Sequence, residues 1–356
     1  MKGVYTGKIL TMSYITLGIE SSCDETAAAV IQDGKKCLSS VVASQIDIHK
    51  EYGGVVPEIA SRLHVELILP VIDKALKEAE MDAANIDGIA VTHGPGLIGS
   101  LMVGLSTAKA LSFSLGVPII GVNHLEAHLS AVHLENEVEF PFVGLVVSGG
   151  HTSLYLVRGY TEFELLGKTR DDAAGEAFDK AAKVLGLSYP GGVQIDRLAR
   201  EGNTSFIDFP RPFKSSMTPD FSFSGLKTSL VYYLRKEPSP DEERLKDICA
   251  SYQEAIVETL VDKTLLSAKG NNVGSVVIAG GVACNSRLRE LAGERLGQKG
   301  LSVYIPSPKY CTDNAAMIGS MGAFRLMKGE RSELDLTTFS TARSKYKRGR
   351  AAAQGS

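Results

Sequence analysis

Two histidines four residues apart, His124 and His128, are the residues whose type and spacing most clearly predict chemistry in this chain. On a helix, four residues correspond to about 400° of rotation, so both imidazoles project from one face. Two imidazoles on one face suit a divalent metal ion, although the same spacing also occurs in surface patches and in satisfied core pairs. Asp313, in the isolated motif Cys311-Thr-Asp-Asn314, offers a carboxylate as third ligand if the chain folds back toward the pair.

The histidine pair does not match the zinc-protease motif. That motif is His-Glu-x-x-His, in which the glutamate directly follows the first histidine and reaches the metal-bound water. Here Glu126 stands two residues after His124, which is about 200° around a helix. We therefore expect Glu126 to point away from the metal face, and a metalloprotease is the least favoured function.

The composition is that of a globular protein with room for two domains. The chain has 356 residues, of which 44% are hydrophobic and 22% charged, as is typical of soluble proteins. Its apolar runs have the length of strands and fall short of a membrane span, and the first fourteen residues lack the apolar core of a signal peptide. Five scattered cysteines fit a reducing compartment. We therefore expect a cytoplasmic protein without a membrane partner.

Two basic stretches could meet phosphates, although the net charge of −3 gives no overall attraction to nucleic acid. One is the run Arg343-Ser-Lys-Tyr-Lys-Arg-Gly-Arg350 near the C-terminus. The other surrounds a polar stretch and comprises Arg211, Lys214, Lys227, Arg235 and Lys236. A solvated basic tail is the commoner meaning of such a run.

Short apolar runs alternate with longer helical patterns, which predicts an α/β fold. Strands are expected at Ile15–Ile19, Ala27–Gln32, Ile86–Thr92, Val117–Val122, Phe142–Val147, Ser153–Arg158 and Ser275–Ile278. Helices are expected at Pro57–Glu80 (interrupted by Pro70), Gly99–Leu115, Leu125–His133, Ala173–Leu185, Glu242–Ala268, Ser286–Gln298 and Asp313–Met327. The stretch from Gly202 to Phe223 is expected to be an ordered loop.

Two strand–turn–strand segments resemble each other within the chain. Residues 18–31 align without a gap with residues 144–157, and Gly, Ser and Thr coincide at the first, fifth and ninth positions. Each segment opens a separate α/β half, which predicts a duplicated two-lobed architecture with a cleft between the lobes. A third glycine turn, Gly280-Gly281, lies between a predicted strand and a predicted helix, an arrangement that brings backbone amides toward an anion or a nucleotide.

Ten motifs in order along the chain carry a resemblance to a known family. They are Gly18-Ile-Glu-Ser-Ser-Cys-Asp-Glu-Thr26, Tyr52-Gly-Gly-Val-Val-Pro-Glu58, His93-Gly-Pro-Gly96, His124-Leu-Glu-Ala-His128, Val147-Ser-Gly-Gly-His-Thr152, Asp171-Asp-Ala-Ala-Gly-Glu-Ala-Phe-Asp-Lys180, Tyr189-Pro-Gly-Gly192, Phe221-Ser-Phe-Ser-Gly-Leu-Lys227, Ala279-Gly-Gly-Val282 and Cys311-Thr-Asp-Asn314. Together they resemble the bacterial tRNA N6-adenosine threonylcarbamoyltransferases, once called glycoproteases or O-sialoglycoprotein endopeptidases. The resemblance runs from Ile15 to Arg325, which is nearly the whole chain.

The resemblance implies the actin-like ATPase superfold, shared with sugar kinases and Hsp70, in which two ribonuclease-H-like lobes flank a nucleotide cleft. We accordingly divide the chain into an N-terminal extension (1–14), an N-terminal lobe (15–135 with 313–328), a C-terminal lobe (136–312) and a basic tail (329–356). The resemblance also implies a reaction. The threonylcarbamoyl group of threonylcarbamoyl-AMP is transferred to N6 of the adenosine 3′ of the anticodon, in tRNAs reading ANN codons, and AMP is released.

Residue by residue, the resemblance implies one Fe²⁺ or Zn²⁺ ion bound by His124, His128 and Asp313. The substrate contacts that it implies fall on Val146, Val147, Ser148, Gly149, Gly150, Asp179, Gly192, Asp196 and Asn285. Asp196 could instead cap a helix that starts after Gly192, and Asn285 could contact adenine or only cap the helix after it. In the first turn, where actin-like folds hold an acidic residue near the phosphates, Asp24 and Glu25 are candidates to orient the amine or to accept its proton.

The exocyclic amine of adenosine is a poor nucleophile, and threonylcarbamoyl-AMP, a mixed anhydride, is already an activated acyl donor. The reaction therefore requires the protein to position the two reactants and to stabilise the charge that develops on the carbonyl group. A metal ion could act as a Lewis acid, or it could only tie the lobes together. A small-molecule kinase of the same superfold is the alternative function, and it would need a catalytic Asp base and magnesium. A non-enzymatic ATP-binding scaffold is a third possibility.

The implied partners are tRNA, an inactive paralogue of the same fold, a small P-loop ATPase, and a threonylcarbamoyl-AMP synthase that acts upstream. The paralogue and the ATPase are expected to bind the N-terminal lobe. Small residues line one predicted helix there, namely Gly99, Ser100, Gly104, Ser106 and Ala108. They could serve either a partner or the close packing of the lobe's own core.

Overall fold

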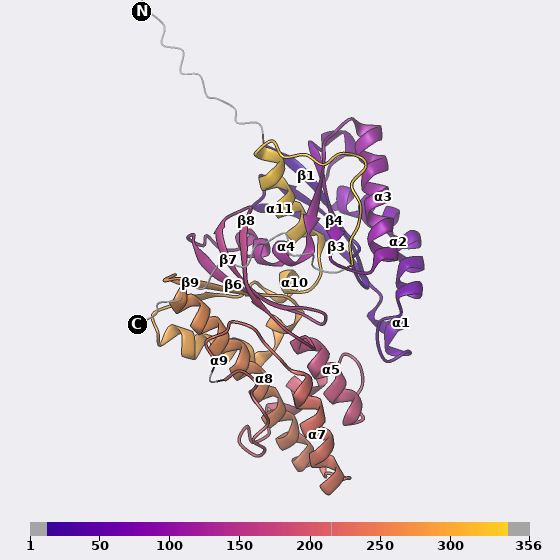
Figure 1. Ribbon diagram of the computed structural model, residues 1–356. Coiled ribbons are helices and arrows are strands. Elements are labelled where there is room, and N and C mark those ends of the chain that lie inside the picture. Colours follow the sequence, from indigo (N-terminus) through magenta and orange to yellow (C-terminus); the bar gives the residue numbers. More distant parts are fainter. Residues whose placement is uncertain (1–12, 215, 341–356) are drawn as a thin grey trace, which may run out of the picture.

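The computed structural model describes residues 13–214 and 216–340, which contain two five-stranded sheets (Figure 1). The first sheet has the order β3-β2-β1-β4-β5, and the second has the order β10-β9-β6-β7-β8. The strands are β1 (Ile15–Glu20), β2 (Glu25–Gln32), β3 (Lys36–Ser44), β4 (Gly88–Gly94), β5 (Ile119–Asn123), β6 (Phe142–Val147), β7 (Thr152–Gly159), β8 (Glu162–Lys168), β9 (Ser275–Ala279) and β10 (Ser302–Tyr304).

The two sheets have the same topology. In the first, β1 pairs antiparallel with β2 and parallel with β4. In the second, β6 pairs antiparallel with β7 and parallel with β9. Gly18 and Gly144 lie in the equivalent strands β1 and β6, so the internal resemblance between their segments corresponds to a repeated strand–turn–strand unit. The predicted two-lobed α/β architecture is confirmed.

The helices form three layers around the sheets (Figure 1). They are α1 (Ile46–Lys50), α2 (Pro57–Glu78), α3 (Ile98–Leu115), α4 (His124–Ser130), α5 (Ala174–Val184), α6 (Gly191–Ala199), α7 (Ser224–Lys236), α8 (Glu242–Gly270), α9 (Ser286–Gly297), α10 (Pro308–Cys311) and α11 (Ala315–Met327), with short 3₁₀ turns η1 (Ala83–Asn85), η2 (Ala131–Leu134) and η3 (Gly281–Cys284). Helices α2 and α3 cover the outer face of the first sheet, α8 and α9 contact the second sheet, and α6 packs on α8 and α5 in the same hydrophobic core. Helices α4 and α11 lie between the sheets and share one hydrophobic core with both.

Close packing at the centre holds α11 against the first sheet. β1 is buried along its whole length, as expected for a strand covered on both faces. A Cβ atom on Gly18 of β1 would lie 2.3 Å from the carbonyl oxygen of Ala315 in α11. Glycine at this position therefore lets the start of α11, which follows Asp313, approach the sheet.

The predicted elements agree with the structure at the centre of each lobe and at the edge strand β5. The prediction missed the other edge strands, β3, β8 and β10, and the helices α1, α6, α7 and α10. Pro70 does not interrupt α2, and α11 begins two residues after Asp313. The described residues of the 202–223 stretch contain no named helix or strand, as expected, although one isolated bridge joins Phe221 to Thr169.

By length and composition, α3 is the one described helix that could cross a membrane, which differs from our expectation that no segment would. Its contacts with α2 and β4 are those of a helix that covers a sheet. Gly104 and Ala108 serve this packing, because a Cβ atom on Gly104 would lie 2.3 Å from Ser21 Oγ and Ala108 is buried, whereas Ser106 is exposed.

The chain after α11 packs on the N-terminal lobe. The Ser332 amide donates to the Ile119 carbonyl at 2.8 Å, Lys109 Nζ donates to the Leu336 carbonyl at 2.7 Å, and the Phe339 amide donates to the His93 carbonyl at 3.1 Å. The predicted basic run 343–350 and residues 1–12 of the predicted extension lie outside the described residues.

Candidate metal centre and substrate cleft

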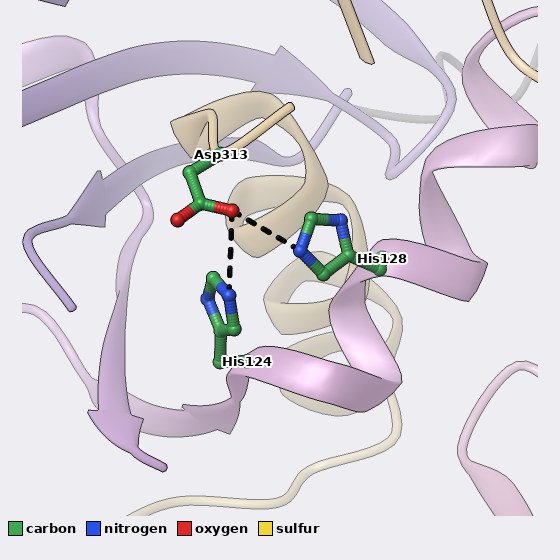
Figure 2. A group of neighbouring side chains, drawn as sticks. All are labelled: His124, His128 and Asp313. Atoms are coloured by element: carbon green, nitrogen blue, oxygen red, sulfur yellow. Dashed lines mark ion pairs between the residues drawn. The ribbon is translucent and has the colours of Figure 1, made fainter. Parts of the chain in front are cut away.

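Two helix starts bring the predicted metal ligands together. Helix α4 begins at His124 directly after β5, and the Asn123 side chain caps it by accepting from the amides of residues 125 (2.9 Å) and 126 (3.3 Å). His128 follows one turn later on the same face. Asp313 precedes α11, whose N-cap Asn314 accepts from the amide of residue 317 at 2.9 Å. Figure 2 shows the two imidazoles and the carboxylate pointing toward one another.

The three side chains have the spacing of a metal-binding group. Asp313 Oδ1 lies 3.4 Å from His124 Nε2 and 3.2 Å from His128 Nε2. One ligand atom from each residue lies within 4.8 Å of the others. The predicted grouping of His124, His128 and Asp313 is therefore confirmed, and the group could hold a metal ion.

The chemistry of the donors fits a metal as well. His128 is fully buried, its Nε2 lies 3.2 Å from Asp313 Oδ1, and its Nδ1 has no hydrogen-bond partner among the described residues. A buried polar atom without a partner costs about 1–3 kcal/mol. Burial also lowers the pKa of His128, which favours the neutral imidazole that binds metals. Two nitrogens and one carboxylate oxygen suit zinc or iron.

A buried glutamate that the sequence analysis did not select orients His124. Glu20, at the end of β1, is fully buried, and its Oε2 lies 3.0 Å from His124 Nδ1. Burial raises the pKa of Glu20, but the charge of His124 and its hydrogen bond outweigh burial, so the net shift is downward. Burial lowers the pKa of His124, but the carboxylates of Asp313 and Glu20 outweigh burial and raise this pKa, so Glu20 orients the ring through Nδ1 and a metal ion has to displace the proton on Nε2.

Asp24 ends the turn between β1 and β2, and Glu25 begins β2 next to this centre. Burial, together with the charges of Asp313 and Asp24, raises the pKa of Glu25 to about 10. Glu25 therefore holds a proton at neutral pH, and a cation bound at Asp313 acts in the opposite direction. Glu126 is not part of the metal group, and its carboxyl contributes to the raised pKa of Tyr155 on β7.

The glycine loop after β6 is exposed beside the centre. Val146 and Val147 are buried strand residues, whereas Gly149 and Gly150 are exposed. The Ser148 amide donates to the His151 carbonyl at 2.8 Å. A Cβ atom on Gly149 or Gly150 would meet nothing within 4 Å, so the space beside the loop is open. Burial, followed by the charges of the two histidine ligands, lowers the pKa of His151 to about 4.

Asp179 and Gly192 meet at the start of α6. The carboxylate of Asp179, on α5, accepts from the Gly191 amide at 2.8 Å. Asp179 therefore caps α6, which sequence reasoning missed because α6 itself was not predicted. Tyr189 precedes α6, and its pKa is raised by burial and by the charges of Asp24 and Asp179, so the first turn and α6 lie close together.

Asp196 and Asn285 meet at the start of α9. Asp196 does not cap α6, because it lies in the second turn of that helix. Its Oδ1 accepts from the amide (3.1 Å) and the hydroxyl (2.7 Å) of Ser286. Asn285 caps α9, as one of its two predicted roles, by accepting from the Leu288 amide at 2.9 Å. Its side-chain nitrogen donates to the Gln253 side chain at 2.7 Å. Its predicted contact with adenine stays a prediction.

Solved structures identify the fold as that of the actin-like ATPases. HypF in a phosphate- and nucleotide-bound form superposes with a TM-score of 0.60 at 15% identity, covering 90% of this chain and 47% of HypF. Component A of (R)-2-hydroxyglutaryl-CoA dehydratase from Acidaminococcus fermentans has a TM-score of 0.54 at 16% identity, covering 88% of this chain and 100% of that one. These similarities define the class of fold, and the predicted superfold is confirmed.

The family follows from sequence similarity. Residues 36–320 match the family model described as tRNA N6-adenosine threonylcarbamoyltransferase. A protein of that name from Syntrophus aciditrophicus is 59% identical, covering 92% of this chain and 96% of the relative. Another, from Syntrophotalea carbinolica, is 54% identical, covering 90% and 94%. The chain belongs to the tRNA N6-adenosine threonylcarbamoyltransferase family, as its motifs predicted.

Proposed function

We propose that this protein transfers the threonylcarbamoyl group of threonylcarbamoyl-AMP to N6 of the adenosine 3′ of the anticodon, in tRNAs reading ANN codons, and releases AMP. The observation that carries the proposal is the His124–His128–Asp313 group beside the helix layer between the sheets of a chain that belongs to this family. The reaction takes place in the cytoplasm, where its tRNA substrate is.

His124, His128 and Asp313 hold one divalent ion, Fe²⁺ or Zn²⁺, in this proposal. The bound ion supplies Lewis acidity toward an oxygen of the acyl donor. Glu20 orients His124 through Nδ1, and burial keeps His128 neutral. Despite burial, Asp313 and Glu20 raise the pKa of His124, so loading of the group releases the proton from His124 Nε2.

The remaining site residues bind and orient the donor. The open space beside Gly149 and Gly150 allows a phosphate or a threonyl carboxylate to approach the backbone of the 148–150 loop. Val146 and Val147 fix the position of that loop from within β6. The carboxylates of Asp179 and Asp196 accept from ribose hydroxyls, and Asn285 contacts the adenine edge, in addition to their helix-capping bonds. Gly192, at the start of α6, permits close approach of the ribose.

Asp24 and Glu25 act on the incoming amine. A protonated Glu25 donates a hydrogen bond, whereas an ionised Glu25 accepts one. Burial raises the pKa of Glu25 most, and the charge of Asp313 adds to it; because a cation at Asp313 offsets this second contribution, loading of the site shifts the carboxyl toward the accepting form. The pair then orients the amine and takes its proton.

We further propose that an inactive paralogue of the same fold docks on α2 and α3 of an N-terminal lobe formed by residues 15–135 and 313–328. Large apolar side chains are exposed on adjacent turns of these two neighbouring helices, at Val65, Leu69, Ile98 and Met102. An apolar patch of this kind is typical of a protein interface. A small P-loop ATPase joins the complex, and a threonylcarbamoyl-AMP synthase provides the donor.

Single-turnover transfer of labelled threonylcarbamoyl from its adenylate to unmodified tRNA tests the reaction. Wild type is compared with His128→Ala and Asp313→Ala in the presence of the partner proteins, and circular dichroism verifies that each variant is folded. Product with wild type and a loss of at least about 100-fold (~2.7 kcal/mol) with either folded variant supports the proposal. No transfer by wild type, with partners shown to be competent using a known relative, refutes it.

A further inference from the structure

Cys284 and Cys311, which the proposed reaction does not use, lie next to each other and close to the loop that carries Asp313. Cys284 ends the η3 turn, Cys311 ends α10, and these two elements pack together. The two thiol groups are close enough that each alters the pKa of the other, and both cysteines are free. Cys311 is fully buried, whereas Cys284 is partly exposed and within reach of small solutes.

A guanidinium group makes the surroundings of this thiol pair electropositive. Arg289 donates to the carbonyl oxygens of Ala283 (2.7 Å) and Pro306 (2.9 Å), and it lies 3.5 Å from the Cys311 sulfur. The neighbouring Cys311 thiol and the charge of Arg289 outweigh burial and lower the pKa of Cys284 to about 7. About half of Cys284 is therefore thiolate at neutral pH. A thiolate beside a second thiol is the arrangement found in cysteines that oxidise reversibly.

We propose that Cys284 and Cys311 form a reversible disulfide when the protein meets hydrogen peroxide. The Cys284 thiolate attacks one peroxide oxygen, the O–O bond breaks, and the departing hydroxide takes a proton to become water, which leaves a sulfenic acid. The Cys311 sulfur then attacks the sulfenic sulfur, the S–O bond breaks, and the second water leaves with the thiol proton. In sum, each sulfur loses one electron and the peroxide is reduced to two waters.

The disulfide acts on the metal centre through the backbone. Cys311 lies two residues before Asp313, and Cys284 directly precedes Asn285. A disulfide holds its sulfurs about 2.0 Å apart, closer than two thiols that are not bonded to each other. η3 and α10 must therefore draw together, and the bond from the Cys311 thiol to the Pro306 carbonyl (3.1 Å) is lost. Asp313 moves with α10 and no longer matches its two histidine partners. Only the effect on tRNA modification rests on the proposed function.

Peptide mapping of the full-length protein under non-reducing conditions tests the bond. After peroxide treatment, wild type is expected to give linked peptides containing Cys284 and Cys311, two hydrogens lighter than the reduced pair and separated again by dithiothreitol. Cys284→Ser is expected to give no such link. Cys37→Ser, which removes a partly exposed thiol elsewhere, is the matched control and is expected to keep the link. Sulfenic or sulfonic acid on Cys284 without the link would overturn the proposal.

Zn²⁺ titration of the same samples tests the consequence. We expect the oxidised wild type to bind Zn²⁺ at least about 10-fold more weakly than the reduced protein, the low end of the effect of disturbed outer contacts at metal sites. Peroxide-treated Cys284→Ser is expected to keep the affinity of its reduced form. A quantitative disulfide that leaves Zn²⁺ affinity unchanged would refute the coupling. Both measurements are made without tRNA, so failure of the proposed reaction would leave them unaffected.

Discussion

Replacing Glu20 by glutamine tests whether a buried carboxylate orients His124 as a metal ligand. The two oxygens of Glu20 accept three hydrogen bonds, from His124 Nδ1 (3.0 Å), Thr92 Oγ1 (2.6 Å) and the Ser22 amide (2.5 Å). Glutamine has the same shape, but an NH₂ group, which only donates, replaces one oxygen. Turned one way, this group faces the Ser22 amide; turned the other way, it faces His124 and Thr92. Either orientation sets a donor against a donor.

This conflict has two effects, one on the stability of the protein and one on its affinity for the metal ion. A buried donor without a partner costs about 1–3 kcal/mol, and we expect the free energy of unfolding of Glu20→Gln to fall by that amount. Loss of the group that orients a metal-binding histidine weakens metal binding roughly 10–100-fold, which corresponds to about 1.4–2.7 kcal/mol. The second effect is specific to the candidate centre, whereas the first is a general cost in stability.

Competition of the metal-free protein against a fluorescent Zn²⁺ chelator measures the affinity, and urea unfolding of the same preparations measures the stability. Glu126→Gln is the matched control, because it makes the same chemical change on α4 at a carboxyl that lies toward Tyr155; it is expected to keep the wild-type affinity. Glu20→Asp keeps the charge but shortens the reach, so its affinity is expected to be intermediate. Wild-type affinity in folded Glu20→Gln would refute the orienting role.

Three further changes test the pH response, the central packing and the interface. Burial lowers the pKa of His133 from 6.5 to about 4, so between these pH values the unfolded state binds more protons than the folded state. The free energy of unfolding therefore falls by about 2 kcal/mol from pH 7 to pH 5. Urea unfolding of His133→Phe is expected to show a smaller loss over the same pH range. Gly18→Ala forces a methyl group against the Ala315 carbonyl and is expected to cost about 1–3 kcal/mol in the same assay at pH 7. Val65→Lys combined with Leu69→Lys, on the exposed apolar face of α2, is expected to abolish co-elution with the paralogue in size-exclusion chromatography and to leave Zn²⁺ affinity unchanged.

Each of these three expectations has an outcome that contradicts it. Equal losses of stability in wild type and His133→Phe would mean that other groups carry the acid response. Wild-type stability of Gly18→Ala would mean that α11 can move away from β1 without cost. Co-elution of the double lysine variant would exclude this face of α2 as the docking site. Met217→Lys, which changes an exposed apolar side chain on the C-terminal lobe, is the control for the interface and is expected to keep co-elution.

The metal group could be predicted from the sequence because its signals are local. His124 and His128 are one helical turn apart, and Asp313 lies in a short motif with no other evident role. Glu20 could not be found in this way, since 104 residues separate it from His124 and no spacing connects the two. The contact between Cys284 and Cys311 is hidden for the same reason. Such pairs depend on how β1, α4 and α10 pack, which a single sequence does not encode locally.

The central strands and the edge strand β5 were predicted, whereas the edge strands β3, β8 and β10 were not, for a physical reason. β1 and β6 are covered on both faces and are buried along their whole length. β3 and β8 mix buried, half-buried and exposed positions, and β10 has only three residues. Helix α6 starts with two glycines, which favour turns, and a hydrogen bond from Gly191 to Asp179 stabilises its start. Tertiary contacts therefore determine the elements that propensity left undecided.

The place of the metal group in the fold explains why polar side chains persist there. Leu125 and Leu129 on α4 provide the apolar contacts that hold the layer between the sheets. Packing alone would favour apolar side chains at positions 124 and 128 as well, because buried imidazoles and carboxylates lose their hydration. An ion that binds only the folded protein offsets this cost by RT ln(1 + [M]/Kd), about 2.7 kcal/mol at a concentration of 100 Kd. The stability of the central layer is therefore linked to occupancy of the group, and any change that displaces Asp313 weakens both the ion site and the contact between α4 and α11.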